Sequence, residues 1–322
     1  MADSNLSRDV FAKLSERILH WEYAPGQRLT GLVETTLEAA AIGADVPLGC
    51  YPVAVHSVFR SALNLQPGDD NLVTIIDSAA LEHPRSIRLG AAADFTALGL
   101  EPRAGGRFEA GGIVLERPGG PPLRISLDQA ARTAIRPLPA IGQLGAPWHT
   151  AVAMLAGLQA QAATDLRIDH LLGPVAAEGI LGRKLASAAL ALGESVRAGA
   201  LEPARGAMAG LVGLGCGLTP SGDDFLCGFV TAGHCHSDRV HLPFLGEMKR
   251  QVLDCLAGTN AISATLLRCA AEGKISGALH DLAQALQGGR DLAGALARLC
   301  AFGHSSGMDI ATGFLYGLSV WA

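Results

Sequence analysis

Charged residues are scarce in this sequence, and their scarcity narrows the range of partners. Only 17% of the 322 residues are charged, the formal net charge is −5, and no long block of Lys and Arg occurs. A nucleic-acid-binding protein carries a basic patch or stripe. We therefore expect no nucleic-acid partner.

Disulfide frameworks and long apolar runs are missing as well. The seven cysteines are an odd number scattered along the chain, unlike the dense framework of a small secreted domain. The longest nearly apolar run, Ala207–Leu218, has 12 residues and holds four glycines, whereas a membrane-spanning helix needs about 20 residues. The first ten residues lack the apolar core of a signal peptide. These absences predict a cytoplasmic protein with no membrane partner.

Aromatic residues make up only 5% of the chain, while hydrophobic residues reach 49%. The high apolar content excludes a disordered protein, and the length is sufficient for about two domains. We expect a folded protein whose core is filled mainly by aliphatic side chains.

The first part of the chain has the pattern of a β-rich domain. After a short helix expected at residues 8–20, apolar runs alternate with turn residues as far as residue 135, and Pro118–Pro122 is expected to form a hairpin loop. The runs are residues 46–59, 71–77, 86–90, 111–117 and 123–127. Residues 136–147 carry three prolines and two glycines without periodicity, which indicates a domain boundary.

The second part is expected to be helical, because Ala- and Leu-rich segments place apolar residues three and four apart. Small residues such as Gly228, Ala232 and Gly233 favour close approach of the helix axes. The prediction is an α+β fold with a β-rich N-terminal domain at 1–140 and an all-helical C-terminal domain at 148–322. The expected helices are Thr150–Gln161, Val175–Arg197, Asp223–His234, Leu245–Leu256, Ser263–Ala271, Gly277–Leu286, Ala293–Phe302 and Met308–Val320.

The stretch GLGCGLTPSGDDFL, residues 213–226, is the most informative in the sequence. The alternating glycines leave their backbone N–H groups uncovered by side chains, and hydroxyl residues and the start of a helix follow them. These features together favour binding of phosphate or another oxyanion. A structural alternative is a well-capped helix in which Ser221 is the N-cap and Asp224 completes an acidic capping box. That alternative leaves the upstream glycines without a role.

Asp223 and Asp224 would repel an oxyanion bound beside them. A divalent cation such as Mg²⁺, held by one or both carboxylates, would remove the repulsion. Alternatively, one Asp orients an amide or ammonium group of the substrate. The sequence does not separate these two interpretations.

The turn Gly303–Gly307, followed by Asp309, forms a second candidate. It matches the pattern G-x-S-x-G, but the preceding segment is helical and no His follows Ser305, so we exclude a serine hydrolase. The turn can instead lend His304 and two hydroxyls to a site, or simply connect two helices with Ser306 as the cap.

Three weaker groups have mainly structural interpretations. His234, Cys235, His236 and His241 do not have the spacing of a metal site. Thr259 or Asn260 can cap the helix that follows. In the β-rich domain, His56, Ser57 and Asn64 either face a ligand or form hydrogen bonds in the core, which we favour.

The signature GLTPSGDD, with HSVFRSALNL at 56–65, the segment 262–273 and the turn GHSSGMD, resembles the AllH-type (YlbF-like) family, long catalogued as a domain of unknown function. The resemblance extends over most of the chain. The departure is Cys216, where a small or proline-like residue is expected.

The resemblance implies a subunit of oxamate carbamoyltransferase in purine and allantoin catabolism, converting oxalurate and phosphate to oxamate and carbamoyl phosphate or the reverse. The alternatives are a non-catalytic ligand-binding or scaffolding subunit and a stand-alone Mg²⁺-dependent hydrolase. We expect a small oxyanion substrate and partner subunits. The expected catalytic residues are Asp223, Asp224 and His304, with the two Asp residues as Mg²⁺ ligands in the metal interpretation. The expected phosphate- or substrate-binding residues are Gly215, Gly217, Thr219, Ser221, Gly222, Ser263, Ser305 and Ser306.

Overall fold

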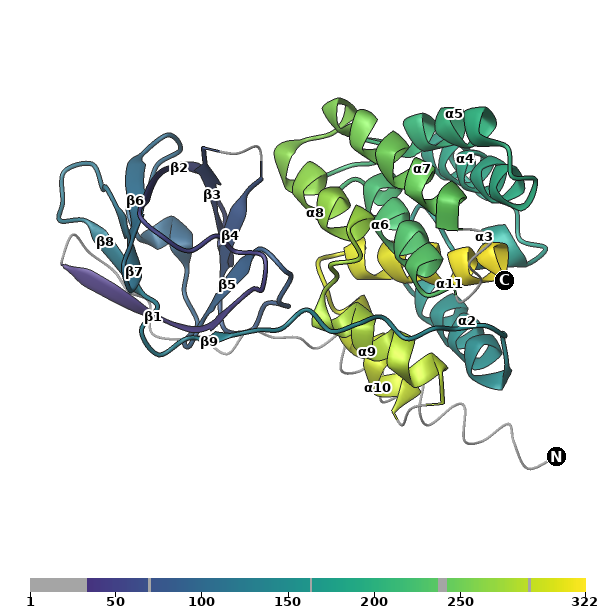
Figure 1. Ribbon diagram of the computed structural model, residues 1–322, viewed down its shortest axis with the longest axis horizontal. Helices are drawn as coiled ribbons and strands as arrows, with labels where there is room; N and C mark the ends of the chain where they lie inside the picture. Colours follow the sequence, from purple (N-terminus) through teal and green to yellow (C-terminus); the bar gives the residue numbers. More distant parts are fainter. Residues whose placement is uncertain (1–33, 69–70, 163, 237–241, 289–290) are drawn as a thin grey trace. The chain divides into compact units, whose positions relative to one another are not determined.

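A computed structural model describes residues 34–322 except 69–70, 163, 237–241 and 289–290. The chain divides into two compact units with a boundary between Arg136 and Pro137. The first is built from strands and the second from helices (Figure 1), which confirms the predicted α+β class. The helix expected at 8–20 lies outside the described residues. The domain limits 1–140 and 148–322 stay predictions.

In the described residues of the first unit, nine strands form one sheet. Its order is β5-β4-β3-β2-β6-β7-β8-β1-β9, and an additional antiparallel pairing of β1 with β5 closes the sheet on itself into a barrel. A short helix, η1 (Phe95–Ala97), lies in the connection after β5. The strands are β1 (Thr35–Ile42), β2 (Tyr51–Val58), β3 (Ala62–Pro67), β4 (Val73–Ile76), β5 (Ser86–Leu89), β6 (Gly105–Glu109), β7 (Gly112–Leu115), β8 (Leu123–Ser126) and β9 (Ala131–Arg132).

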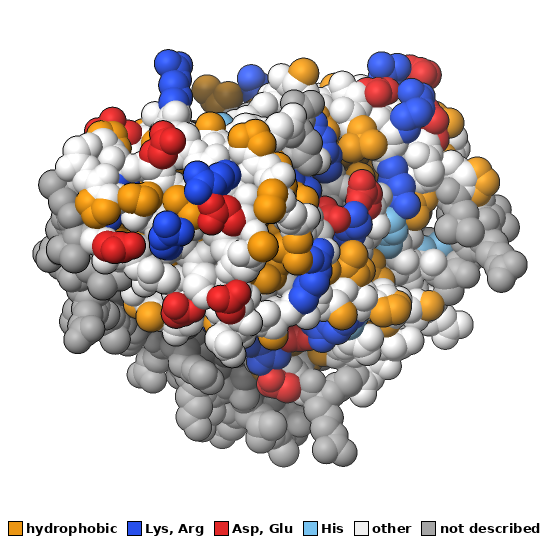
Figure 2. All heavy atoms as spheres, turned by 60° about the vertical axis from the view of Figure 1, so that its left-hand side comes forward, with side chains coloured by type: hydrophobic (Ala, Val, Ile, Leu, Met, Phe, Trp, Pro, Cys, Tyr) orange, Lys and Arg blue, Asp and Glu red, His pale blue; other side chains and the backbone are white. Residues whose placement is uncertain are grey.

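The interior of this unit is filled by alternating side chains of the strands, as expected for a sheet with one buried face. Val55, Leu63, Ile75 and Ile87 are at most 1% exposed. Tyr51 stacks on Phe108 with a ring-centroid distance of 4.6 Å. On the face shown in Figure 2, acidic and basic side chains are interspersed and do not form a field of one sign.

The hairpin predicted at Pro118–Pro122 is present, because β7 and β8 pair antiparallel with Leu115 opposite Leu123. The first strand was not predicted. Its sequence TTLEAAAI is rich in residues that favour helices, but β1 pairs with β8 and β9 along one edge and with β5 along the other. Tertiary pairing therefore overrides the local preference.

The second unit is helical, and its helices appear in teal to yellow in Figure 1. No described helix combines the length and the apolar character that a membrane span requires. The helices are α2 (Ala146–Gln159), α3 (Asp169–Leu172), α4 (Ile180–Arg197), α5 (Leu201–Leu211), α6 (Ser221–His234), α7 (Leu242–Asp254), η3 (Leu256–Gly258), α8 (Ala261–Ala271), α9 (Gly277–Leu286), α10 (Leu292–Cys300) and α11 (Ser306–Trp321).

Helices α6 and α11 lie at the centre of this unit, and almost all of their residues are buried. A Cβ at Gly228 would overlap the carbonyl oxygen of Ile310, and one at Gly313 would overlap that of Phe225. The backbones of the two helices therefore touch at these glycines, as the small residues of α6 predict. This close crossing brings the start of α11 to the start of α6.

Several details of the helical unit differ from the predictions; for example, α3 was not predicted and α2 begins at Ala146 and not at residue 150. Helix α4 begins at Ile180 and not at residue 175, because Gly179 has a φ of 65° that interrupts helical backbone. The helix α5 was not predicted, since its sequence is short and rich in Gly and Pro. The core is mainly aliphatic, as predicted, and four of the scarce aromatic residues gather between α6 and α11: Phe225, Phe229, Tyr316 and Trp321.

Candidate functional site

The Gly-rich loop, residues 213–220, leads directly into α6. Gly213, Gly215 and Gly217 all have positive φ, at 72°, 142° and 95°. A Cβ at Gly213 would overlap the carbonyl oxygen of Gly258, and one at Gly215 would overlap the backbone nitrogen of Ser221. Packing thus requires the first two glycines without any ligand. Gly217 differs, because nothing lies within 4 Å of the position of its Cβ.

The backbone N–H groups of residues 215–219 donate no hydrogen bond to any described residue. The chain before and after them is held firmly: Gly213 N donates to Asp223 Oδ1 at 2.8 Å, and Gly222 N donates to the carbonyl of Leu214 at 2.8 Å. A run of free donors is therefore fixed at the N-terminus of a 14-residue helix. This is the arrangement that binds anions in helix-start loops.

The capping interpretation of this segment is wrong. Helix α6 begins at Ser221, its N-cap position is Pro220, and no side chain caps it. The N–H groups of Asp223 and Asp224 both donate to the carbonyl of Pro220. The two carboxylates are consequently available for other contacts, and they have different neighbours.

One carboxylate is satisfied by the protein itself. Asp223 is 1% exposed and accepts hydrogen bonds from Gly213 N and from the hydroxyl of Thr259, which precedes α8. Burial raises the pKa of Asp223, and these donors together with the nearby hydroxyl of Ser263 lower it in part. We call this group, Asp223 with Gly213, Thr259 and Ser263, the Thr259 side.

The other carboxylate faces α11. Asp224 is also 1% exposed, and its Oδ2 has no hydrogen-bond partner among the described residues. Burial raises the pKa of Asp224 well above its usual range; the charges of Asp309 and Asp223 raise it further, while the hydroxyls of Ser306 and Thr219 partly lower it. Those two hydroxyls are 2.7 Å apart.

Asp309, on α11, completes this group. It is 1% exposed, and neither of its carboxylate oxygens has a hydrogen-bond partner of ordinary geometry in the described chain. Burial raises the pKa of Asp309 to about 7, the charge of Asp165 adds to this, and the nearby hydroxyls of Ser221 and Ser305 oppose it. We call Asp224, Asp309, Thr219 and Ser306 the Asp309 side.

The contact of Thr219 with Ser306 brings the two motifs together. The interpretation of Ser306 as a helix cap is wrong, because it lies inside α11 and bonds to the loop. Ser305 occupies the N-cap position without a capping hydrogen bond. His304 lies on the exposed turn before α11, and its side chain has no hydrogen bond or ion pair with a described residue. Asp309 was not predicted as a site residue, although its position in the GHSSGMD turn marked it.

The metal interpretation of the Asp pair has no ligand cluster to support it. No three His, Cys, Asp or Glu side chains in the described residues are grouped to hold a metal ion. In addition, both oxygens of Asp223 already accept hydrogen bonds. A Mg²⁺ site at Asp223 and Asp224 stays a prediction.

The weaker candidates have structural roles. His234 Nε2 lies 3.1 Å from the carbonyl of Ala271, and its pKa is lowered to about 4 mainly by burial. Asn260 caps α8 by accepting from Ile262 N and Ser263 N. In the first unit, buried Asn64 donates to Ser57 and accepts from Thr74, which agrees with the core interpretation. For His56 that interpretation is wrong, because its side chain is exposed. His241 lies outside the described residues.

Comparison with known families finds two matches. The family described as "Oxamate carbamoyltransferase subunit AllH" matches residues 211–318, which contain both sides of the α6 start, and the "AllH family N-terminal domain" matches residues 32–133. No solved structure matches the chain. The chain belongs to the AllH family, whose name denotes a subunit of oxamate carbamoyltransferase.

Proposed function

We propose that the chain is a catalytic subunit of a carbamoyltransferase, and that the N–H groups of residues 215–219 bind the oxyanion of phosphate or carbamoyl phosphate. The observation that carries the proposal is the run of free donors at the start of α6. The helix dipole adds partial positive charge at the same place. The open space beside Gly217 lets a ligand approach the backbone closely.

The reaction that the family name supports is transfer of a carbamoyl group between oxamate and phosphate. A phosphate oxygen attacks the carbamoyl carbon of oxalurate, the bond from that carbon to the oxamate nitrogen breaks, and this nitrogen takes up a proton as oxamate leaves. The reverse reaction follows the same steps backward. The protein must therefore hold the oxyanion and supply or accept one proton.

The Asp309 side is suited to supply or accept the proton of this reaction. A carboxyl group whose pKa is near 7 is protonated in part at neutral pH, which is the condition for general acid and base catalysis. The hydroxyl of Thr219 in the loop contacts that of Ser306 on α11, and both lie near Asp224, so they can pass a proton between the bound oxyanion and Asp224. His304, exposed on the adjoining turn, is placed to contact the substrate from solvent.

The other residues of the predicted site position the loop. Asp223 holds Gly213, and Gly222 has no room for a side chain because its Cβ would overlap the carbonyl of Leu211. Ser221 and Ser305 face Asp309, and Ser263 faces Asp223. These residues influence substrate binding without contacting the substrate, because they fix the shape of the loop and affect the charge of the two carboxylates.

Alkylation of Cys216 tests the oxyanion site. This thiol is exposed between Gly215 and Gly217, and Cys50, exposed in the other unit, is an internal control. We expect phosphate and carbamoyl phosphate to slow the reaction of Cys216 with iodoacetamide and to leave the rate at Cys50 unchanged, at constant ionic strength. Equal rates at Cys216 with and without these ligands would contradict the site.

A second candidate function is a non-catalytic, ligand-binding or scaffolding subunit. The observation that favours it is the complete internal satisfaction of Asp223, which gives that residue a structural role. Turnover of oxalurate with phosphate separates the two. Under the first proposal Asp224→Asn lowers turnover of the assembled enzyme, and under the second it leaves turnover unchanged while phosphate still protects Cys216.

A further inference from the structure

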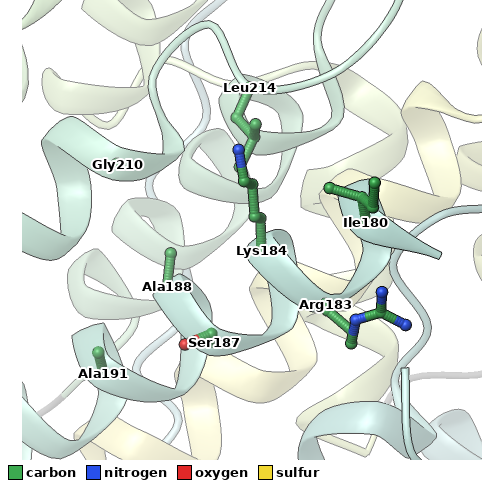
Figure 3. A pocket seen from close by; sticks show the side chains of 8 residues that line it. All are labelled: Ile180, Arg183, Lys184, Ser187, Ala188, Ala191, Gly210 and Leu214. Atoms are coloured by element: carbon green, nitrogen blue, oxygen red, sulfur yellow. The ribbon is translucent and has the colours of Figure 1, made fainter. Parts of the chain in front are cut away.

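A shallow groove of about 560 Å³ runs between α4 and α5, away from the carboxylates of the candidate site. Figure 3 shows Arg183, Lys184 and Ala188 along α4, with Gly210 of α5 and Leu214 on the other side. Leu214 belongs to the Gly-rich loop. The groove therefore ends at the segment that we propose binds the oxyanion.

The charge of the groove is unbalanced. Arg183 and Lys184 are exposed, and neither side chain forms an ion pair or hydrogen bond with a described residue. No acidic side chain lines the groove. In a chain with a net charge of −5, this face has a local excess of positive charge.

The apolar part of the groove is equally exposed. Ile180, at its edge, is 72% exposed, and Leu218 in the adjoining loop is 49% exposed. Ala188 and Gly210 carry the smallest side chains, so the backbone of another helix can approach closely. Large apolar side chains beside unpaired charges are characteristic of surfaces that bind another protein.

We propose that this groove docks an amphipathic helix of another subunit of the carbamoyltransferase, and this inference rests on the proposed function. Asp or Glu side chains of that helix pair with Arg183 and Lys184, while its apolar side chains cover Ile180 and Leu214. A single oxyanion is too small to cover a groove of this size.

Docking at this groove also touches the oxyanion loop. Figure 3 shows Lys184 pointing across the groove toward Leu214, whose carbonyl accepts the N–H of Gly222 at the start of α6. An acidic side chain that pairs with Lys184 therefore lies beside the loop. Assembly and oxyanion binding are coupled through this residue.

Reconstitution with purified partner subunits of the enzyme tests the groove. Full-length wild type and the double variant Arg183→Glu, Lys184→Glu are titrated with those subunits, and complex formation is followed by sedimentation velocity. We expect at least a 10-fold loss of affinity in the variant. We also expect the affinity of wild type to fall with salt and that of the variant to depend less on it.

The control is Arg205→Glu, which makes one such charge reversal, half the change of the double variant, on α5 outside the groove and should assemble like wild type. If the charge reversals prevent folding, Arg183→Gln with Lys184→Gln is measured instead, with an expected loss of several fold. Unchanged assembly of the folded variants overturns the docking proposal. The isolated chain is also tested for self-association. If wild type self-associates and the double variant does not, the groove binds a second copy of this chain, and the docking proposal is overturned.

The alkylation assay separates this inference from the proposed function. Phosphate protection of Cys216 in wild type combined with normal assembly of the charge variants overturns only the groove. Loss of assembly in the variants without phosphate protection in wild type overturns the oxyanion site and leaves the groove standing.

Discussion

The two sides of the α6 start differ although their carboxylates are neighbours in the sequence. On the Thr259 side, both oxygens of Asp223 receive hydrogen bonds from the protein. On the Asp309 side, Asp224 keeps one oxygen without a partner and Asp309 keeps two in the described structure. An unsatisfied buried carboxylate costs free energy, so a fold retains it mainly where it has a function.

The comparison separates positioning from chemistry. The Thr259 side fixes the Gly-rich loop, since Asp223 joins its first residue to the turn before α8. The Asp309 side holds two buried carboxyl groups whose pKa values are raised mainly by burial, and a pair of hydroxyls that joins the loop to α11. Adjacent residues of one motif thus have different surroundings, because a helix start directs consecutive side chains to different neighbours.

The largest effect is expected from a change that separates α6 from α11 and so dismantles the Asp309 side. A side chain at Gly313 overlaps the backbone of Phe225. Gly313→Val should lower the free energy of unfolding by more than about 4 kcal/mol, because backbone atoms cannot move aside as a side chain does. Denaturant titration measures it.

Gly206→Ala is the matched control for that variant. Gly206 lies in α5 with nothing within 4 Å of its Cβ position. It should stabilise the protein by about 0.5–1 kcal/mol. Equal stability of wild type and Gly313→Val would show that the two helices are not held in contact there.

The second effect concerns turnover. Asp224→Asn removes the proton of a buried carboxyl with almost no change of shape, and we expect the assembled enzyme to lose at least two orders of magnitude in kcat, about 3 kcal/mol of transition-state stabilisation. The melting temperature should change little. Steady-state kinetics with all partner subunits present measures the loss, and near-normal turnover favours the scaffolding function.

The sequence predicted the class of this fold and marked the two segments that form the candidate site, but not the different surroundings of Asp223 and Asp224. Glycines and hydroxyls around GLTPSGDD mark a helix-start loop by local chemistry alone. Asp309 lies 85 positions after Asp224 in the chain, and its importance depends on burial and on the crossing of α6 and α11. Likewise, β1 is a strand only because three other strands pair with it. Such long-range effects leave no local pattern.

The third effect is a pH dependence of stability. The pKa of Asp309 is raised from 3.8 to about 7 in the folded protein. Between these values the folded state holds a proton that the unfolded state has lost, so stability falls as pH rises, with a limiting slope of about 1.4 kcal/mol per pH unit. Stability is then independent of this group above pH 7 and below pH 4.

Asp309→Asn should remove that part of the slope. Denaturant titrations at several pH values between 4 and 8 compare the variant with wild type, and Glu101→Gln, an exposed carboxylate of the first unit, is the control. A variant slope identical to that of wild type would show that Asp309 ionises normally in the folded protein.

The fourth effect tests the Thr259 side. Asp223→Ala leaves the N–H of Gly213 and the hydroxyl of Thr259 without an acceptor and should cost about 1–3 kcal/mol. Asp223→Asn keeps one acceptor oxygen and should cost less. Thermal unfolding of both variants measures the difference, and a larger cost for Asn than for Ala would contradict the assigned hydrogen bonds.

The smallest effect on stability is expected from a substitution at His304. This variant tests the role of the exposed turn apart from that of the buried Asp309 side. The His304 side chain is exposed and has no hydrogen bond in the described structure, so His304→Gln should change the free energy of unfolding by less than about 0.5 kcal/mol. If the imidazole contacts substrate, KM or kcat changes at least several fold while phosphate protection of Cys216 is retained. Unchanged kinetics in the assembled enzyme would remove His304 from the proposed catalytic residues and leave Asp224 and Asp309, whose carboxyl groups are buried where α6 and α11 begin.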